Sequence, residues 1–193
     1  TTEIYTLSLH DALPISRYPT GRGLEAARTL AAEAGMAGIP VVSGLARGID
    51  SAAHRGAIAG GGATWAVLGR GIDEVYPPSN RDLASAMLEH GGGLVSEYPP
   101  GTSPSRWTFL ERNRILVGLC RSAVVVEAPG HSGALSRAGF ANDEGRDVYV
   151  AGACRGGYRS AGSDALAEDG ATVIHGLGDI LDDWKVYQSA EAF

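Results

Sequence analysis

The sequence predicts an α/β fold, an extended Rossmann-like domain with a mostly parallel sheet and helices on both faces. Short β-branched runs alternate with Ala-rich segments along most of the 193 residues, and this alternation is typical of βαβ units. Residues 122–127, SAVVVE, form an almost continuous apolar run, as expected for a strand that is buried on both faces. A chain of this length is expected to form one domain.

The first half of the chain contains two such alternations. Residues 23–34 are Ala-rich and predict a helix, and residues 39–42 predict a strand. A second helix is expected over residues 51–59, because the glycine run at 60–62 stops it. Residues 64–68 predict the next strand.

The middle of the chain continues the pattern. Ser79 followed by Asp82 is typical of a helix N-cap with an acidic residue in the first turn, so we expect a helix to begin there. Residues 94–96 predict a short strand, and an irregular loop with three prolines at 98–108 leads into a helix at 110–119.

The last third is expected to complete the sheet. It contains predicted helices at 133–144, 164–168 and 178–184 and predicted strands at 148–151 and 172–174.

Residues 1–16, TTEIYTLSLHDALPIS, differ from the rest of the chain in composition and contain neither Gly nor Arg. The segment resembles translated sequencing-adaptor read-through, so we predict that it is non-native or disordered and that the first strand of the domain is missing. A genuine N-terminal arm is the alternative. The core domain is then expected over residues 17–184, with a tail at 185–193.

Charge and cysteine content exclude several classes of protein. A net charge of −6 argues against nonspecific coating of nucleic acid. Of the 16 basic residues, 15 are Arg, which suits bidentate phosphate contacts but is also what a GC-rich genome produces. Cys120 and Cys154 are too few for a disulfide framework or a metal knuckle. We expect a cytoplasmic protein with no membrane span and no secretory leader.

Four loops follow predicted strands and are expected to share one edge of the sheet, where folds of this class bind ligands. They cover residues 43–50, 69–80, 97–114 and 127–135.

The first of these loops turns at Ser43 and Gly44 into a helix and contains Arg47. A small-residue turn before a helix places backbone N–H groups and the positive helix end together, which suits a phosphate. The alternative is a tight connection whose glycines serve only packing.

An Arg-Asn-Arg cluster preceded by aromatic residues ends the third loop. Its members are Trp107, Phe109, Arg112, Asn113 and Arg114. Arginines beside aromatic rings are typical of single-stranded nucleic acid sites, where bases stack and phosphates are neutralised. The alternative is that Phe109 anchors the core and one Arg pairs with Glu97 or Glu111.

The fourth loop places Ser132 and Gly133 where a phosphate or ribose contact would form, whereas His54 and His131 are expected to be structural. The sequence contains no Ser-His-Asp set, carboxylate dyad, metal-ligand spacing or Walker A lysine. We therefore expect no catalysis, no metal and no cofactor.

Together these segments resemble the DNA-processing protein A family, DprA or Smf. The matching segments are SGLARGIDSAAHRGA at 43–57, AVLGRGIDEVYPPSNRDLA at 66–84, LVSEYPPGTSPSRWTFLERNRILVGL at 94–119, VVVEAPGHSGAL at 124–135 and EGRDVYVAG at 144–152. The resemblance implies a dimeric, non-enzymatic protein that binds single-stranded DNA and helps load the RecA recombinase in natural transformation or recombination.

By position, the resemblance also implies a set of DNA-binding residues. They are Arg17, Ser43, Gly44, Arg47, Phe109, Arg112, Asn113, Arg114, Ser132 and Gly133. Two alternatives stay open: a hydrolase that cleaves nucleoside monophosphates to base and ribose phosphate, and a small-nucleotide-binding protein without affinity for DNA.

Overall fold

The computed structural model describes residues 7–11, 19–129 and 145–190 of the chain. Within this part, seven parallel strands form one sheet in the order β4-β3-β2-β1-β5-β6-β7. The strands are β1 (Leu7–Asp11), β2 (Val41–Ser43), β3 (Thr64–Val67), β4 (Gly93–Val95), β5 (Ser122–Glu127), β6 (Asp147–Ala151) and β7 (Thr172–Ile174). The chain order reverses between β1 and β5, which is the switch point of the sheet.

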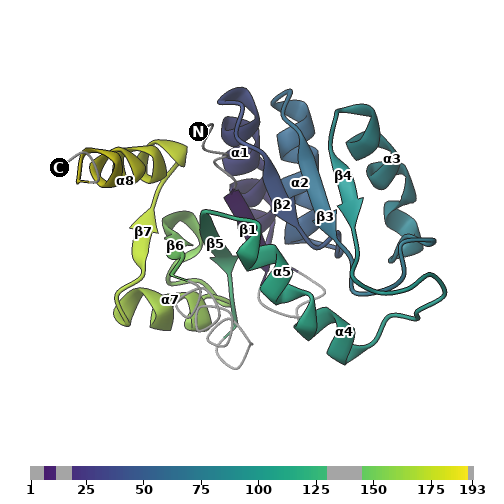
Figure 1. Ribbon diagram of the computed structural model, residues 1–193. Helices are drawn as coiled ribbons and strands as arrows, with labels where there is room; N and C mark the ends of the chain where they lie inside the picture. Colours follow the sequence, from purple (N-terminus) through teal and green to yellow (C-terminus); the bar gives the residue numbers. More distant parts are fainter. Residues whose placement is uncertain (1–6, 12–18, 130–144, 191–193) are drawn as a thin grey trace.

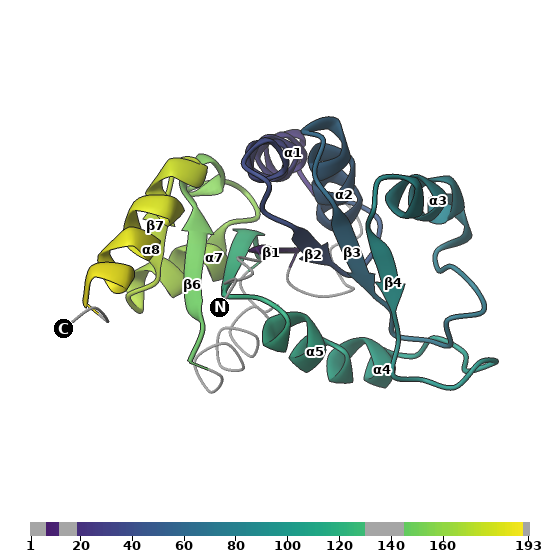
Figure 2. The ribbon, with the colours of Figure 1, turned by 45° about the horizontal axis from the view of Figure 1, so that its top comes forward.

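Helices cover both faces of the sheet (Figures 1 and 2). They are α1 (Gly21–Met36), α2 (Ile49–Ala59), α3 (Arg81–Glu89), α4 (Arg106–Glu111), α5 (Asn113–Gly118), α7 (Ala161–Glu168) and α8 (Leu177–Ala190). The predicted α/β class with a parallel sheet is confirmed.

The core is divided by the sheet into layers. Val124 and Val126 of β5 pack with α1, α2 and α8, whereas Val125 between them packs with Leu166 of α7. Leu116 of α5 packs below Val42 and Val67 on the same side as α7. The apolar run of β5 is therefore buried on both faces, as its sequence predicts.

The N-terminal segment differs from its prediction. Residues Leu7–Asp11 form β1, which lies between β2 and β5 and pairs in parallel with both. The physical reason is that the facing edges of β2 and β5 carry backbone N–H and C=O groups that need partners in the middle of a sheet. A first strand is thus present, at a position where the sequence predicted none.

Other boundaries shift by a few residues. The helix predicted over 110–119 is two short helices, because α4 begins at Arg106 and ends at Glu111 before α5 begins at Asn113. Ser105 caps α4 by accepting a hydrogen bond from the N–H of Thr108. The helix predicted over 133–144 lies outside the described residues.

Among the described residues, no helix is both long and apolar enough to cross a bilayer.

Candidate nucleic-acid interface

The turn between β2 and α2 has a shape that the chain itself holds. Leu45 is buried with φ of 60°, and Gly48 has φ of 94°. The buried carboxylate of Asp50 accepts a hydrogen bond from the Ala46 N–H at 3.1 Å, and Ser51 Oγ donates to the Ala46 carbonyl at 2.6 Å. These contacts lock the turn without any ligand, so its surface is preorganised.

The loop after β3 packs against this turn. Asn80 is buried, and its Nδ2 donates to the Leu45 carbonyl at 2.8 Å and to Ser51 Oγ at 2.9 Å. Arg47 is exposed and donates from Nε to Ser79 Oγ at 3.3 Å. Asn80 therefore fixes the position of the turn. The sequence did not indicate this role, because the contact joins residues that are far apart in the chain.

Arg112 lies at the junction of α4 and α5 and is only 6% exposed. Its Nη1 donates to the carbonyl of Val67, at the end of β3. A Cβ atom on Gly44 would overlap the Arg112 guanidinium, so Gly44 allows this close approach because it has no side chain. Arg112 thus joins the third loop to the ends of β2 and β3, whereas the sequence analysis expected it to reach a ligand directly.

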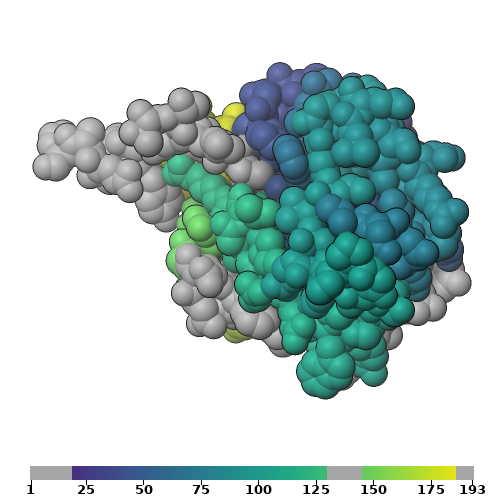
Figure 3. Space-filling model, turned by 45° about the vertical axis from the view of Figure 1, so that its right-hand side comes forward, coloured from purple at the N-terminus to yellow at the C-terminus, as the bar shows by residue number. Residues whose placement is uncertain are grey.

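Aromatic rings surround this junction. The Phe109 ring lies 5.9 Å from the Arg112 guanidinium carbon and 6.0 Å from the Tyr76 ring, tilted by 39° to the latter. Phe109 is half-buried against Gly69, where a Cβ would lie 2.8 Å from Phe109 Cδ1. Trp107 is 73% exposed on α4. The teal surface at the bottom of Figure 3 belongs to the part of the chain that contains α4. Tyr76, beside Phe109, and Trp107, on α4, therefore present accessible rings.

Arg114 points outward and forms an ion pair with Glu97. This is one of the two pairings considered for the Arg-Asn-Arg cluster, and it is confirmed. The other acid, Glu111, instead accepts a hydrogen bond from Tyr98 Oη at 2.9 Å. Burial and the Glu111 carboxylate raise the pKa of Tyr98 to about 12. Tyr98 therefore stays protonated and donating throughout the neutral range.

The remaining residues of the expected DNA-binding set are either buried or outside the described residues. Ser43 is fully buried at the end of β2, and Asn113 is 2% exposed at the start of α5. Arg17, Ser132 and Gly133 lie outside the described residues. The structure therefore brings the Ser43–Arg47 turn against the Phe109–Arg114 segment, with Arg47 and Arg114 exposed and Arg112 enclosed.

Glu127 ends β5 at the switch point and holds the start of α1. Its carboxylate accepts hydrogen bonds from the Thr20 N–H at 2.9 Å and from Thr20 Oγ1 at 2.8 Å. Thr20 in turn caps α1 by accepting from the N–H of Gly23 at 3.1 Å. Both Glu127 oxygens therefore already accept hydrogen bonds from the protein.

His54 lies beneath the turn and is fully buried on α2. Thr64 Oγ1 donates to the Val41 carbonyl at 2.8 Å, so it accepts a hydrogen bond from His54 Nδ1 at 2.7 Å. Burial, with a further contribution from Arg112, lowers the pKa of His54 from 6.5 to about 4, although Asp50 opposes the shift. The imidazole is therefore neutral at pH 7, as the structural interpretation of this residue expects.

Folding stability is expected to fall on acidification because of His54. The histidine takes up a proton near pH 6.5 in the unfolded chain and near pH 4 in the folded protein. The contribution of neutral His54 to the free energy of unfolding is therefore complete above pH 6.5 and is lost as the pH falls from 6.5 to 4. The loss by pH 4 is roughly 3 kcal/mol. Urea unfolding at several pH values measures it. In the His54→Gln variant the decline between pH 6.5 and 4 should be shallower by about this amount, and an equal slope in both proteins would contradict the assignment.

The chain is similar to proteins of one family along most of its length. The family model for DNA recombination-mediator protein A matches residues 13–185. Protein Smf of Synechocystis is 42% identical over 166 residues, which is 86% of this chain and 42% of that protein. DNA processing protein DprA of Streptococcus pneumoniae is 41% identical over 146 residues, or 75% of this chain and 51% of that protein. The chain therefore spans about half or less of the length of these relatives.

Solved structures show the same fold. DprA from Streptococcus pneumoniae superimposes with a TM-score of 0.81 at 34% identity, covering 93% of this chain and 61% of that one. DNA processing protein A from Helicobacter pylori, whose structure concerns its single-stranded DNA binding mode, superimposes with a TM-score of 0.77 at 24% identity. The match covers 94% of this chain and 80% of that one.

Proposed function

Because the chain belongs to the DNA recombination-mediator protein A family, we propose that it binds single-stranded DNA at the edge formed by residues 43–50 and 109–114. The observation that carries this proposal is the contact between Gly44 and Arg112, which brings the β2–α2 turn against the α4–α5 junction. The family resemblance expected from the sequence motifs is confirmed.

The arginines are expected to divide the task. Arg47 and Arg114 are exposed and would contact phosphates, since guanidinium groups pair with phosphate oxygens in bidentate fashion. Arg112 is enclosed and would keep the two segments in register. Tyr76 and Trp107 are exposed aromatic residues, and bases stack on such rings with little regard to sequence.

RecA loading and homodimer formation are part of the same proposal, as are a cytoplasmic location and the absence of catalysis. They are supported by family membership and concern the longer relatives as well as this chain. Co-precipitation with purified RecA and sedimentation of the isolated chain test the first two.

The proposal is tested by fluorescence anisotropy with labelled oligo-dT and the full chain. We expect single strands to bind more tightly than duplex and affinity to fall as salt rises, because bound arginines displace counterions. Arg47→Ala and Arg114→Ala should each reduce the slope of log K against log salt by about 0.7. Lys185→Ala, which removes a charge from the distant α8, should leave the slope unchanged. Unchanged affinity in both arginine variants would contradict the assignment, and release of free base from AMP would favour the hydrolase alternative.

Glu97 is expected to restrain DNA binding. Its carboxylate forms an ion pair with Arg114, so a phosphate must compete with it for the guanidinium. Glu97→Gln keeps the shape of the side chain but removes the charge, and we expect it to tighten oligo-dT binding several-fold at low salt. The gain should disappear in the Glu97→Gln, Arg114→Ala double variant. A gain that persists there would show that Glu97 acts on another group.

A further inference from the structure

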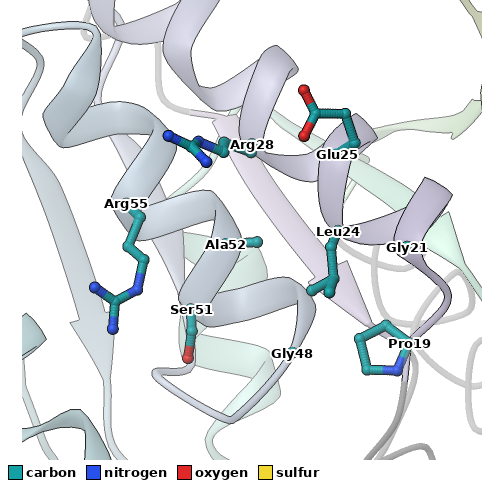
Figure 4. Close-up of a pocket in the computed structure, with 9 residues that line it drawn as sticks. All are labelled: Pro19, Gly21, Leu24, Glu25, Arg28, Gly48, Ser51, Ala52 and Arg55. Atoms are coloured by element: carbon teal, nitrogen blue, oxygen red, sulfur yellow. The ribbon is translucent and has the colours of Figure 1, made fainter.

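A pocket of about 480 Å³ lies between the N-terminal halves of α1 and α2, beside the turn of residues 43–50 (Figure 4). Leu24 and Arg28 of α1 face Ser51 and Arg55 of α2 across it. None of these four residues is among the DNA-binding residues that the family resemblance implies.

Two guanidinium groups line this pocket. Arg28 reaches from α1 toward α2, and Arg55 projects from α2 (Figure 4). Both side chains are exposed, and neither forms an ion pair or hydrogen bond with the residues that the structure describes. Glu25 is the one acidic residue in the lining, so the pocket carries a net positive charge that no internal contact uses.

The pocket also has apolar lining residues. Leu24 is 36% exposed and lies over the gap between the helices, with Ala52 and Pro19 on either side. A surface of this kind, next to two arginines, suits a molecule that is apolar at one end and anionic at the other. A nucleotide has this chemistry, because its base and sugar can contact apolar side chains while its phosphate pairs with the guanidinium groups.

The pocket is continuous with the proposed DNA edge. Gly48 and Ser51 line it and also end the turn that contains Arg47. Ser51 Oγ donates to the Ala46 carbonyl at 2.6 Å, so the wall shared by the two sites is fixed by a hydrogen bond. A strand that passes Arg47 therefore meets this pocket next.

We propose that the pocket between α1 and α2 binds one nucleotide unit, with its phosphate held by Arg28 and Arg55, and that it extends the binding path of a single strand beyond the edge. The inference rests on the proposed function and adds a second contact region to it. Only strands long enough to reach the pocket would contact Arg28 and Arg55, so shorter strands should bind without them.

The test compares short and long oligo-dT, of about 5 and about 20 nucleotides, on the full chain and on the Arg28→Ala, Arg55→Ala double variant. For the long strand we expect the double variant to lose about tenfold in affinity and its salt slope to fall by about 0.7, because the one phosphate held in the pocket is no longer neutralised. Binding of the short strand should not change. Thymidine monophosphate is titrated in parallel, since a free nucleotide has the same chemistry as a nucleotide within a strand.

Glu25→Gln serves as the matched variant from the same pocket and should tighten binding of the long strand, whereas Lys185→Ala should have no effect. Equal affinity and slope for the long strand in the double variant, together with no binding of thymidine monophosphate, would overturn the inference and leave the proposed function intact. If thymidine monophosphate binds and needs both arginines while the long strand does not, the pocket is a mononucleotide site. If the unmodified chain binds neither oligonucleotide, the proposed function itself fails.

Discussion

A chain that lacks residues 1–11 is expected to lose most of its folding stability, whereas a chain that lacks only residues 1–6 should keep it. Leu7–Asp11 form β1, which pairs with β2 on one side and β5 on the other. Its removal leaves backbone N–H and C=O groups without partners at the centre of the sheet. Each such group costs about 1–3 kcal/mol, against a total stability of about 5–15 kcal/mol for a domain of ordinary size.

Urea unfolding followed by circular dichroism compares the two truncated chains with the full one. The shorter deletion is the matched control, because it retains the strand. If both deletions unfold at the same urea concentration as the full chain, β1 contributes nothing to stability. The proposal that residues 1–16 are foreign to the domain would then be favoured.

Arg112→Ala is expected to have the largest effect of any single substitution at the candidate site. The change removes the donor to the Val67 carbonyl and the packing of the guanidinium against Gly44 and Phe109. A buried acceptor left without a partner costs about 1–3 kcal/mol, and the lost packing of the long side chain adds to this. Since Arg112 joins the α4–α5 junction to the β2–α2 turn, oligo-dT affinity should fall more than in Arg114→Ala.

Arg106→Ala is the matched control, because Arg106 is an exposed arginine on the neighbouring α4. It should change the midpoint of urea unfolding little, whereas Arg112→Ala should lower it clearly. Binding is measured at a temperature where near-ultraviolet circular dichroism shows each variant to be folded. A folded Arg112→Ala protein with full stability and normal DNA affinity would show that the enclosed guanidinium has no positioning role.

Much of the fold could be predicted from local sequence. The β5 run is apolar on both faces, and the structure buries both. The glycine run after α2 ends that helix at Ala59, as expected. These predictions succeed because the periodicity of apolar residues within a segment indicates whether that segment forms a strand or a helix.

The same local reasoning could not decide that the protein encloses one arginine of the cluster. Arg112 and Arg114 are two positions apart and belong to one motif, yet Arg112 is 6% exposed and Arg114 pairs with Glu97 at the surface. Gly44, far away in the chain, leaves room for the Arg112 guanidinium because it has no side chain. Helical spacing places Arg112 on the same side as Leu116, four positions later and also buried, but nothing in residues 106–118 shows that a charged side chain fits there.

Sequence alone determined the α/β class, the alternation of strands and helices, the family, and the two turns that form the candidate edge. Tertiary structure alone decided that Leu7–Asp11 lie at the centre of the sheet, that Asn80 holds the turn, and that Arg112 is enclosed while Arg47 and Arg114 remain exposed. The physical reason is the distance along the chain between the residues that interact. Secondary structure follows from neighbours along the chain, whereas strand pairing and side-chain burial depend on contacts between segments that only packing brings together.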